Sequence, residues 1–375
     1  MSEYQYYEFQ AIDRPLTADQ QAKVAALSSR AHVTAHGASF VYNYGDFRGD
    51  PEQLLRDYFD AMLYMANWGA RRLMFRIPCA LMDTKRVKLY CISEDIELRQ
   101  TPNKQHVVVD LEFNDEEQAE WTEGEGWLDA LTALREELIQ GDLRVLYLAW
   151  LKAAEVAMER EDIAEDTLEP PVPAGLGQLS PALETFVRFV DVDEALLAVA
   201  AQHSGNRCQE APQLEPWITQ LPAAEQYDFL VRLSRGEPNL SLLLRRRLQE
   251  LATGTQPHEQ EAETERRTIA ALREAAAVWR QQKQAAEQRH AELTRQRHLE
   301  ALAVREPQAW QEVEALIEEK KATAYASAVA LLEDLSDLAT SRGEVACFQQ
   351  RMADIERTYS NRSALLRRMR QSRLI

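Results

Sequence analysis

The chain has 375 residues, of which 45% are apolar, and its formal net charge is −18. A chain of this length and composition has room for two or three domains and a sizeable core. Its longest apolar runs, such as residues 195–201, are too short to cross a bilayer, and its N-terminus lacks the basic and apolar regions of a signal peptide. We therefore expect a cytoplasmic protein and exclude one that spans a membrane.

The acidic charge is concentrated in the first half of the chain. Residues 1–170 hold 32 acidic and 17 basic residues, whereas residues 257–375 hold 19 of each. An acidic front domain should repel nucleic acids and anionic membranes. We therefore do not expect this protein to bind nucleic acid directly or to bind membranes.

Residues 1–160 alternate between segments typical of strands and segments typical of helices. A strand is expected around Tyr7, and a hairpin should turn at residues 101–104. The helix that begins after Asp50 carries an apolar stripe, which we expect to continue to Met65. These segments predict an acidic α+β head domain with a mixed sheet of about five strands.

From Trp127 onward the apolar residues follow the helical period, with a break near Gly141. Residues 161–179 contain the run LEPPVPAGLGQL, whose prolines and glycines cannot continue a helix, so we expect a linker there. A small helical domain should follow at residues 180–256. The predicted fold class is thus α+β, with an all-α domain after the head.

Residues 257–375 have heptad spacing, and after Pro257 they contain only two helix breakers, Pro307 and Gly343. We predict a C-terminal antiparallel coiled-coil arm of three helices, the first about 45 residues long. The seam of this first helix is weakly apolar, because Lys283, Ala286 and His290 occupy heptad positions. An arm with such a seam is either mobile or completed by a partner helix.

The stretch FVYNYGDFRGDPEQLL, residues 40–55, has two interpretations. Asp50 with Pro51 and Gln53 has the pattern of a helix start, which predicts a strand-to-helix turn. The alternative is a ligand site, because loops between elements often bind ligands. Its candidate residues are Tyr42, Tyr44, Asp46, Arg48, Arg71 and Arg72.

The sequence predicts no cofactor and no metal site. His32 and His36 lie four residues apart without a third ligand in view. The four cysteines are far apart and lack CxxC spacing, which is typical of buried thiols in a reducing compartment; they are Cys79, Cys91, Cys208 and Cys347.

Several segments resemble those of a large family of uncharacterised bacterial proteins. They are YYEFQAIDRPLT, YGDFRGDPEQLLRDYFDAMLYMANWGARRLMFRIP, GDLRVLYLAWL and EPPVPAGLGQLSPAL. The resemblance covers roughly residues 4–205 and leaves out the C-terminal helices. It implies a bacterial cytoplasmic setting and carries over no catalytic residue.

Sustained heptads, segregated charge and the lack of a catalytic motif favour a non-enzymatic interaction or scaffold protein. We expect it to bind a protein partner, or to self-associate, through the C-terminal helices. The candidate partner-binding residues are Trp279, Trp310, Phe348, Arg367, Arg368 and Arg370. Two alternatives stay open: an enzyme or small-ligand binder at the residue 40–55 loop, and an accessory factor of a nucleic-acid-handling complex.

Overall fold

The structure is a computed structural model that describes residues 4–91, 94–115, 123–159, 164–206, 215–237, 239–253 and 266–375. The chain divides into two compact units, an N-terminal unit (Met1–Trp279) and a C-terminal unit (Arg280–Ile375). The α+β class is confirmed, because a sheet near the N-terminus is followed by helices alone. The domain boundaries expected at residues 160, 179 and 256 stay predictions.

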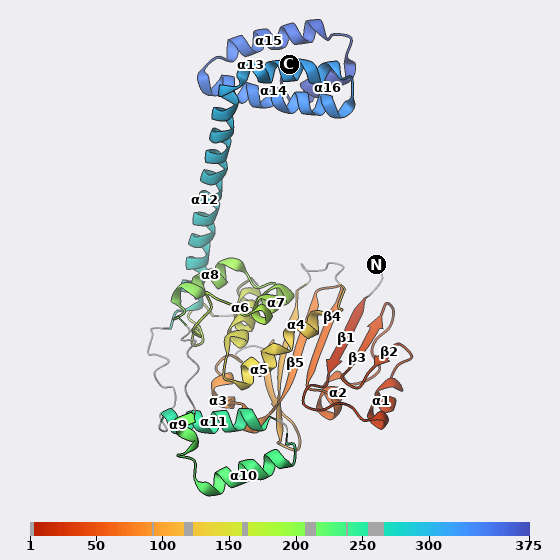
Figure 1. The fold of residues 1–375 in the computed structure, drawn as a ribbon, viewed down its shortest axis with the longest axis vertical. Helices are drawn as coiled ribbons and strands as arrows, with labels where there is room; N and C mark the ends of the chain where they lie inside the picture. Colours follow the sequence, from red (N-terminus) through yellow and green to blue (C-terminus); the bar gives the residue numbers. More distant parts are fainter. Residues whose placement is uncertain are drawn as a thin grey trace. The chain divides into compact units, whose positions relative to one another are not determined.

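The N-terminal unit is built on a seven-stranded sheet in the order β2-β3-β1-β4-β5-β7-β6 (Figure 1). The strands are β1 (Gln5–Gln10), β2 (Ala31–Val33), β3 (Gly37–Tyr42), β4 (Ala61–Ala66), β5 (Ala70–Pro78), β6 (Ile96–Gln100) and β7 (His106–Asn114). Every neighbouring pair is antiparallel. The sheet therefore differs from the mixed one of about five strands that the sequence suggested.

Residues 61–66 account for part of this difference. Helix α2 (Pro51–Tyr58) is capped at Phe59, and the apolar run that follows forms the central strand β4 instead of more helix. A strand buried on both faces has a continuous apolar sequence, and periodicity alone does not separate it from a buried helix. Trp68 and Gly69 accordingly form the turn between β4 and β5, where Gly69 has a φ of 95°.

Helices cover both faces of the sheet, and successive residues of a strand supply the two cores. In β4, Leu63 and Met65 face one core, whereas Met62 faces the other. The first core is closed by α4 (Trp127–Leu131), α5 (Ala133–Ile139), α6 (Arg144–Glu159), α7 (Pro181–Val190), α8 (Glu194–His203) and the first turns of α12 (Ile269–Val304). The second core is closed by α1 (Ala18–Ala25) and α2.

Further helices complete the described part of the N-terminal unit. They are η1 (Cys79–Leu81), α3 (Thr84–Val87), α9 (Glu215–Ile218), α10 (Ala223–Ser234) and α11 (Leu240–Thr253). The hairpin of β6 and β7 around residues 101–104 is confirmed.

The proline-rich segment is part of the folded N-terminal unit. Pro170 is buried and Pro171 is half-buried, and Tyr90 donates a hydrogen bond of 2.9 Å to the carbonyl of Pro171. Just before them, Leu168 forms an isolated antiparallel bridge with Thr268. The segment therefore pairs with the residues that lead into α12.

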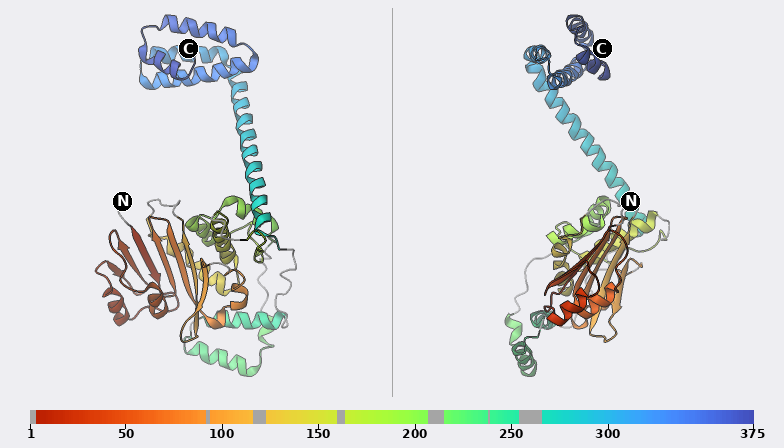
Figure 2. Two further views of the ribbon diagram at one scale, coloured as in Figure 1. Left: turned by 180° about the vertical axis from the view of Figure 1, so that it is seen from behind. Right: turned by 90° about the vertical axis from the view of Figure 1, so that its right-hand side faces the viewer.

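The C-terminal unit is a bundle of helices (Figure 2). Its core lies around α14 (Ala322–Arg342), whose Leu332 and Leu335 are buried. Its other helices are the end of α12, α13 (Glu306–Glu318), α15 (Val345–Thr358) and α16 (Ser363–Gln371). The helix breaks next to Pro307 and at Gly343 match the sequence prediction, but a third break follows α13, where Lys320 has a φ of 59°. The prediction of three helices is therefore wrong, because this break separates α13 from α14.

Candidate functional site

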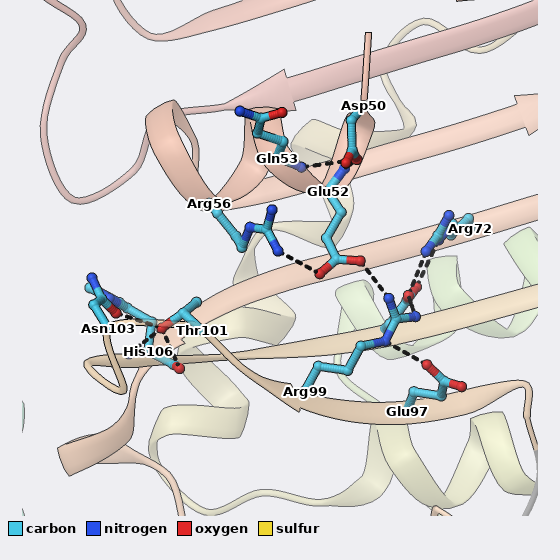
Figure 3. A network of polar contacts seen from close by, with 11 residues as sticks. Asp50, Glu52, Gln53, Arg56, Arg72, Glu97, Arg99, Thr101, Asn103 and His106 are labelled. Atoms are coloured by element: carbon cyan, nitrogen blue, oxygen red, sulfur yellow. Dashed lines mark hydrogen bonds and ion pairs between the residues drawn. The ribbon is translucent and has the colours of Figure 1, made fainter.

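The residue 40–55 loop is first of all a helix start. Oδ1 of Asp50 accepts hydrogen bonds from the backbone N–H of Glu52 at 2.9 Å and of Gln53 at 3.1 Å (Figure 3). Pro51 occupies the first turn of α2, where its missing N–H costs nothing. The strand-to-helix turn predicted from the sequence is confirmed.

Phe47 fixes this loop to the sheet, a role that the sequence analysis missed. Its ring lies 5.1 Å from the Tyr7 ring and 4.8 Å from the Phe40 ring, centroid to centroid, and the side chain is buried. Gly49 passes so close that a Cβ there would lie 2.7 Å from the Phe47 ring. The loop therefore requires glycine at position 49, because any side chain would displace Phe47 from the aromatic cluster.

Except for Tyr42, the polar candidates of the loop lie at the surface. Tyr42 ends β3 with its ring buried and its hydroxyl bonded to Ser28 Oγ at 2.9 Å, whereas Tyr44 lies beyond the strand and is 71% exposed. Asp46 accepts a hydrogen bond of 2.9 Å from the Gln5 side chain. Arg48 is exposed and makes no ion pair within the described residues, so it does not pair with Asp46. Because Tyr44 lies beyond the end of β3, the two tyrosines do not share a strand face.

Arg71 and Arg72 point to opposite faces of β5. Arg71 is buried and donates to the carbonyl oxygens of Ala66 at 2.8 Å and Ala70 at 3.0 Å, so it closes the hairpin turn. Arg72 makes a two-point contact with Asp110, at 2.9 and 2.6 Å. Alternation along a strand thus separates Arg71 from the face that carries Tyr42, and the expected site does not come together.

A charged network surrounds Arg72, as Figure 3 shows. Arg99 of β6 donates to Asp110 at 2.5 Å and also bonds Glu52 of α2, which in turn accepts a hydrogen bond from Arg56. Each guanidinium of this network has a carboxylate partner. The network therefore ties α2 to the sheet and commits the Nε and Nη2 edge of Arg72 to Asp110.

A cavity of about 1190 Å³ lies on the other face, where β1, β2 and β3 extend beyond the cover of the helices. Its walls come from β1, the β2–β3 connection, α4, α5 and the start of α11. The ionisable residues that line it are Glu8, Asp13, His32, His36, Glu125, Asp129, Arg135 and Glu136. Arg135 is already engaged, because it donates to Asp13 at 2.8 Å and to the carbonyl of Arg76 at 2.9 Å. The cavity wall is thus acidic.

Glu8 is the most perturbed carboxyl of this wall. Burial raises its pKa to about 7, with further increases from Asp129 and Glu125, while the hydroxyl of Tyr6, at 3.2 Å, lowers it. Gln10, two residues along the same strand, bonds to Asp129. Glu8 is therefore a carboxyl that can exchange a proton near neutral pH.

The cavity does not form a metal centre from its histidines and carboxylates. Nowhere in the part of the chain that the structure describes do three or more His, Cys, Asp or Glu side chains converge as metal ligands. Cys79, Cys91 and Cys347 are free thiols, and Cys208 lies outside the described residues. Within the same described ranges, no helix has both the length and the apolar character needed to cross a membrane.

The candidate partner-binding residues have different environments. Trp279 is partly buried and packs against the core of the N-terminal unit. Inside the C-terminal bundle, the ring centroid of Trp310 lies 5.9 Å from that of the buried Phe348. Each of these aromatic rings therefore packs within its own unit. Arg367 and Arg370 are exposed on α16, and Arg368 is half-buried. The arginines, not the aromatic residues, are therefore the part of this set that faces solvent.

Comparison of this chain with protein-family models, with curated proteins and with solved structures gave no match. The resemblance to a bacterial family therefore stays a prediction.

Proposed function

We propose that this chain is a non-enzymatic interaction protein of the bacterial cytoplasm, which binds a protein partner through its C-terminal helices. One observation carries the proposal: the heptad stripe of α12 is buried at its N-terminal end and exposed beyond it. Ile269 and Leu272 belong to the core of the N-terminal unit, whereas the stripe positions from Ala286 onward are exposed. This exposed part of the stripe leaves a helix face for another molecule to cover.

The exposed part of the stripe has the residue types of a helix-packing face. Ala286, His290 and Leu293 are exposed, and Leu293 leaves 54% of its surface in solvent. Small and aliphatic residues at successive heptad positions allow a second helix to approach closely. His290 supplies a polar group that selects a partner with a complementary group.

The competing enzyme interpretation has less support. It needs Tyr42, Asp46, Arg48 and Arg71 in one place, yet Arg71 is buried at the hairpin turn and Tyr42 is bonded to Ser28. The interaction proposal instead needs only a partner helix that is complementary to the exposed stripe.

The test compares two double variants of the full chain. Ala286→Glu with Leu293→Glu places charge on the stripe, whereas Gln281→Glu with Gln288→Glu adds the same charge to exposed positions on the opposite side of α12. Each tagged chain is used to capture binding proteins, and its own mass in solution is measured by light scattering. We expect a partner, or a second copy, that is lost only with the stripe variant. A wild-type chain that stays a monomer and captures no protein reproducibly, or a partner retained by both variants, contradicts the proposal.

A further inference from the structure

Helix α16 combines a buried apolar face with an exposed basic one. Leu365, Leu366 and Met369 are buried in the C-terminal bundle. Arg367 and Arg370 are exposed on the other side, and no acidic residue occurs between Asn361 and Ile375. This helix therefore places positive charge at the surface without a local countercharge.

Most other arginines of the C-terminal unit have carboxylate partners. Arg295 bonds Asp334 at 2.6 Å, and Arg342 bonds Glu306 at 2.9 Å. Arg367 makes no ion pair among residues 280–375, all of which the structure describes, and Arg370 only reaches Glu356 at 3.6 Å. Arg368 and Arg373 are likewise without an ion pair among those residues. Of these four arginines, only Arg370 has a carboxylate partner, so most of the positive charge at α16 is left uncompensated by the unit itself.

These arginines border a hollow of about 390 Å³. Its lining consists of Ser360, Ser363, Leu366, Arg367, Arg370 and Gln371. The two guanidinium groups offer forked donors that match a carboxylate, and the two serine hydroxyls add further donors. Leu366 supplies an apolar patch for the methylene groups of an acidic side chain. The hollow therefore has the chemistry to hold glutamate or aspartate side chains.

We infer that the basic face of α16 is a docking surface for an acidic segment of a protein partner. This inference rests on the proposed interaction function and specifies the chemistry of the partner. An acidic polypeptide fits better than a nucleic acid, because the basic residues flank one small hollow instead of following a long backbone.

The experiment uses the full chain and a fluorescein-labelled decaglutamate peptide, with binding followed by fluorescence anisotropy. Arg367→Glu with Arg370→Glu should weaken binding by about tenfold or more, because it reverses both guanidinium charges at the hollow. The matched control, Lys320→Glu with Lys321→Glu, reverses two exposed cations outside the hollow and should change the affinity by less than about twofold. Circular dichroism verifies that each variant keeps its helices.

Further binding measurements distinguish an acidic peptide from a nucleic acid, and they separate this inference from the proposed function. A single-stranded oligothymidylate of the same length should bind more weakly than the peptide; if it binds more tightly and is lost with the arginine variant, the inference is overturned. Equal losses with both variants, or no peptide binding by the wild type, also overturn it. The stripe variant of α12 should still bind the peptide. Stripe-dependent capture of a partner without peptide binding would leave the proposed function in place and remove only the acidic-segment inference.

Discussion

Arg267 and Glu169 form a buried ion pair, in which Nε of Arg267 donates to Oε2 of Glu169 at 2.7 Å and Nη2 donates to Oε1 at 2.8 Å. The side chain of Glu169 is only 2% exposed and also accepts a hydrogen bond from the hydroxyl of Tyr147. The backbone N–H of Glu169 donates to the carbonyl of Arg267 at 2.8 Å. The proline-rich segment and the residues before α12 are thus fastened to each other by both side chains and backbone.

Replacing Glu169 with Gln should destabilise the N-terminal unit by about 3–5 kcal/mol, because it leaves the Arg267 guanidinium buried without its counter-ion. The free energy of unfolding is measured by urea titration with tryptophan fluorescence. Glu165→Gln, at an exposed position four residues earlier, is the control and should cost less than about 0.5 kcal/mol. Adding Arg267→Gln to Glu169→Gln should restore part of the loss; a loss that is simply additive would refute the coupling of the two side chains.

The sequence indicated that this segment is not helical, but it did not indicate that the segment packs within the N-terminal unit. Pro170 and Pro171 rule out a helix, and that local conclusion holds. Whether such a segment is a free linker or part of a core depends on its partners, and Arg267 lies 98 residues further along the chain. No local pattern connects the two positions. The same limit explains β4, whose burial on both faces depends on β1 and β5 as neighbours.

Substitutions at Phe47 and Arg48 test whether the residue 40–55 loop has a structural role or a binding role. Phe47→Ala should lower the free energy of unfolding by about 3–5 kcal/mol, because it removes a buried ring from the cluster with Tyr7 and Phe40. Arg48→Ala should change it by less than about 0.5 kcal/mol, because the side chain is exposed. Thermal unfolding of both variants provides the measurement. A loop that tolerates Phe47→Ala without loss is not held to the sheet by this ring.

The raised pKa of Glu8 predicts a pH-dependent stability. In the folded state the carboxyl titrates at about 7, against an ordinary value of 4.5, so between these two pH values the folded chain holds a proton that the unfolded chain has lost. The contribution of Glu8 to stability therefore falls as the pH rises through this window. Glu8→Gln removes the effect and should melt at a higher temperature than the wild type at about pH 8.

The difference between Glu8→Gln and the wild type should disappear below the ordinary pKa of 4.5, where the carboxyl is protonated in both states. Glu184→Gln, an exposed carboxylate on α7, is the control and should give no gain at high pH. Melting temperatures measured across the pH series test the prediction. A constant difference between Glu8→Gln and the wild type at every pH would show that packing, not protonation, causes it.

The candidate sites illustrate what a sequence alone can specify. Asp50 and Pro51 were predictable because a helix start is a local arrangement of neighbouring residues. Glu8 was not, since its pKa depends on Asp129, which reaches the same wall from α4 and bonds Gln10 across 119 positions of the chain. Likewise, two adjacent arginines of one strand seem a natural pair in sequence, yet alternation separates Arg71 from Arg72.

The boundary of the N-terminal unit provides the last prediction. A chain ending at residue 256 lacks Arg267 and the first turns of α12, whereas one ending at residue 279 keeps them. Those turns place Ile269 and Leu272, exposed by 2% and 0%, in the core beneath α6 to α8. Their removal uncovers apolar surface and leaves Glu169 buried without its ion-pair partner. We expect the shorter chain to be less stable by on the order of 5 kcal/mol.

Differential scanning calorimetry of the two truncated chains and the full chain measures this effect. The chain of residues 1–279 should show the same transition temperature for the N-terminal unit as the full chain, while that of residues 1–256 should melt well below it. Adding Leu272→Ala to the longer truncation should lower its stability by about 2–5 kcal/mol, because the side chain is fully buried. If residues 1–256 instead melt at the same temperature as residues 1–279, the first turns of α12 do not contribute to the core, and the stripe of α12 would then be free along its whole length.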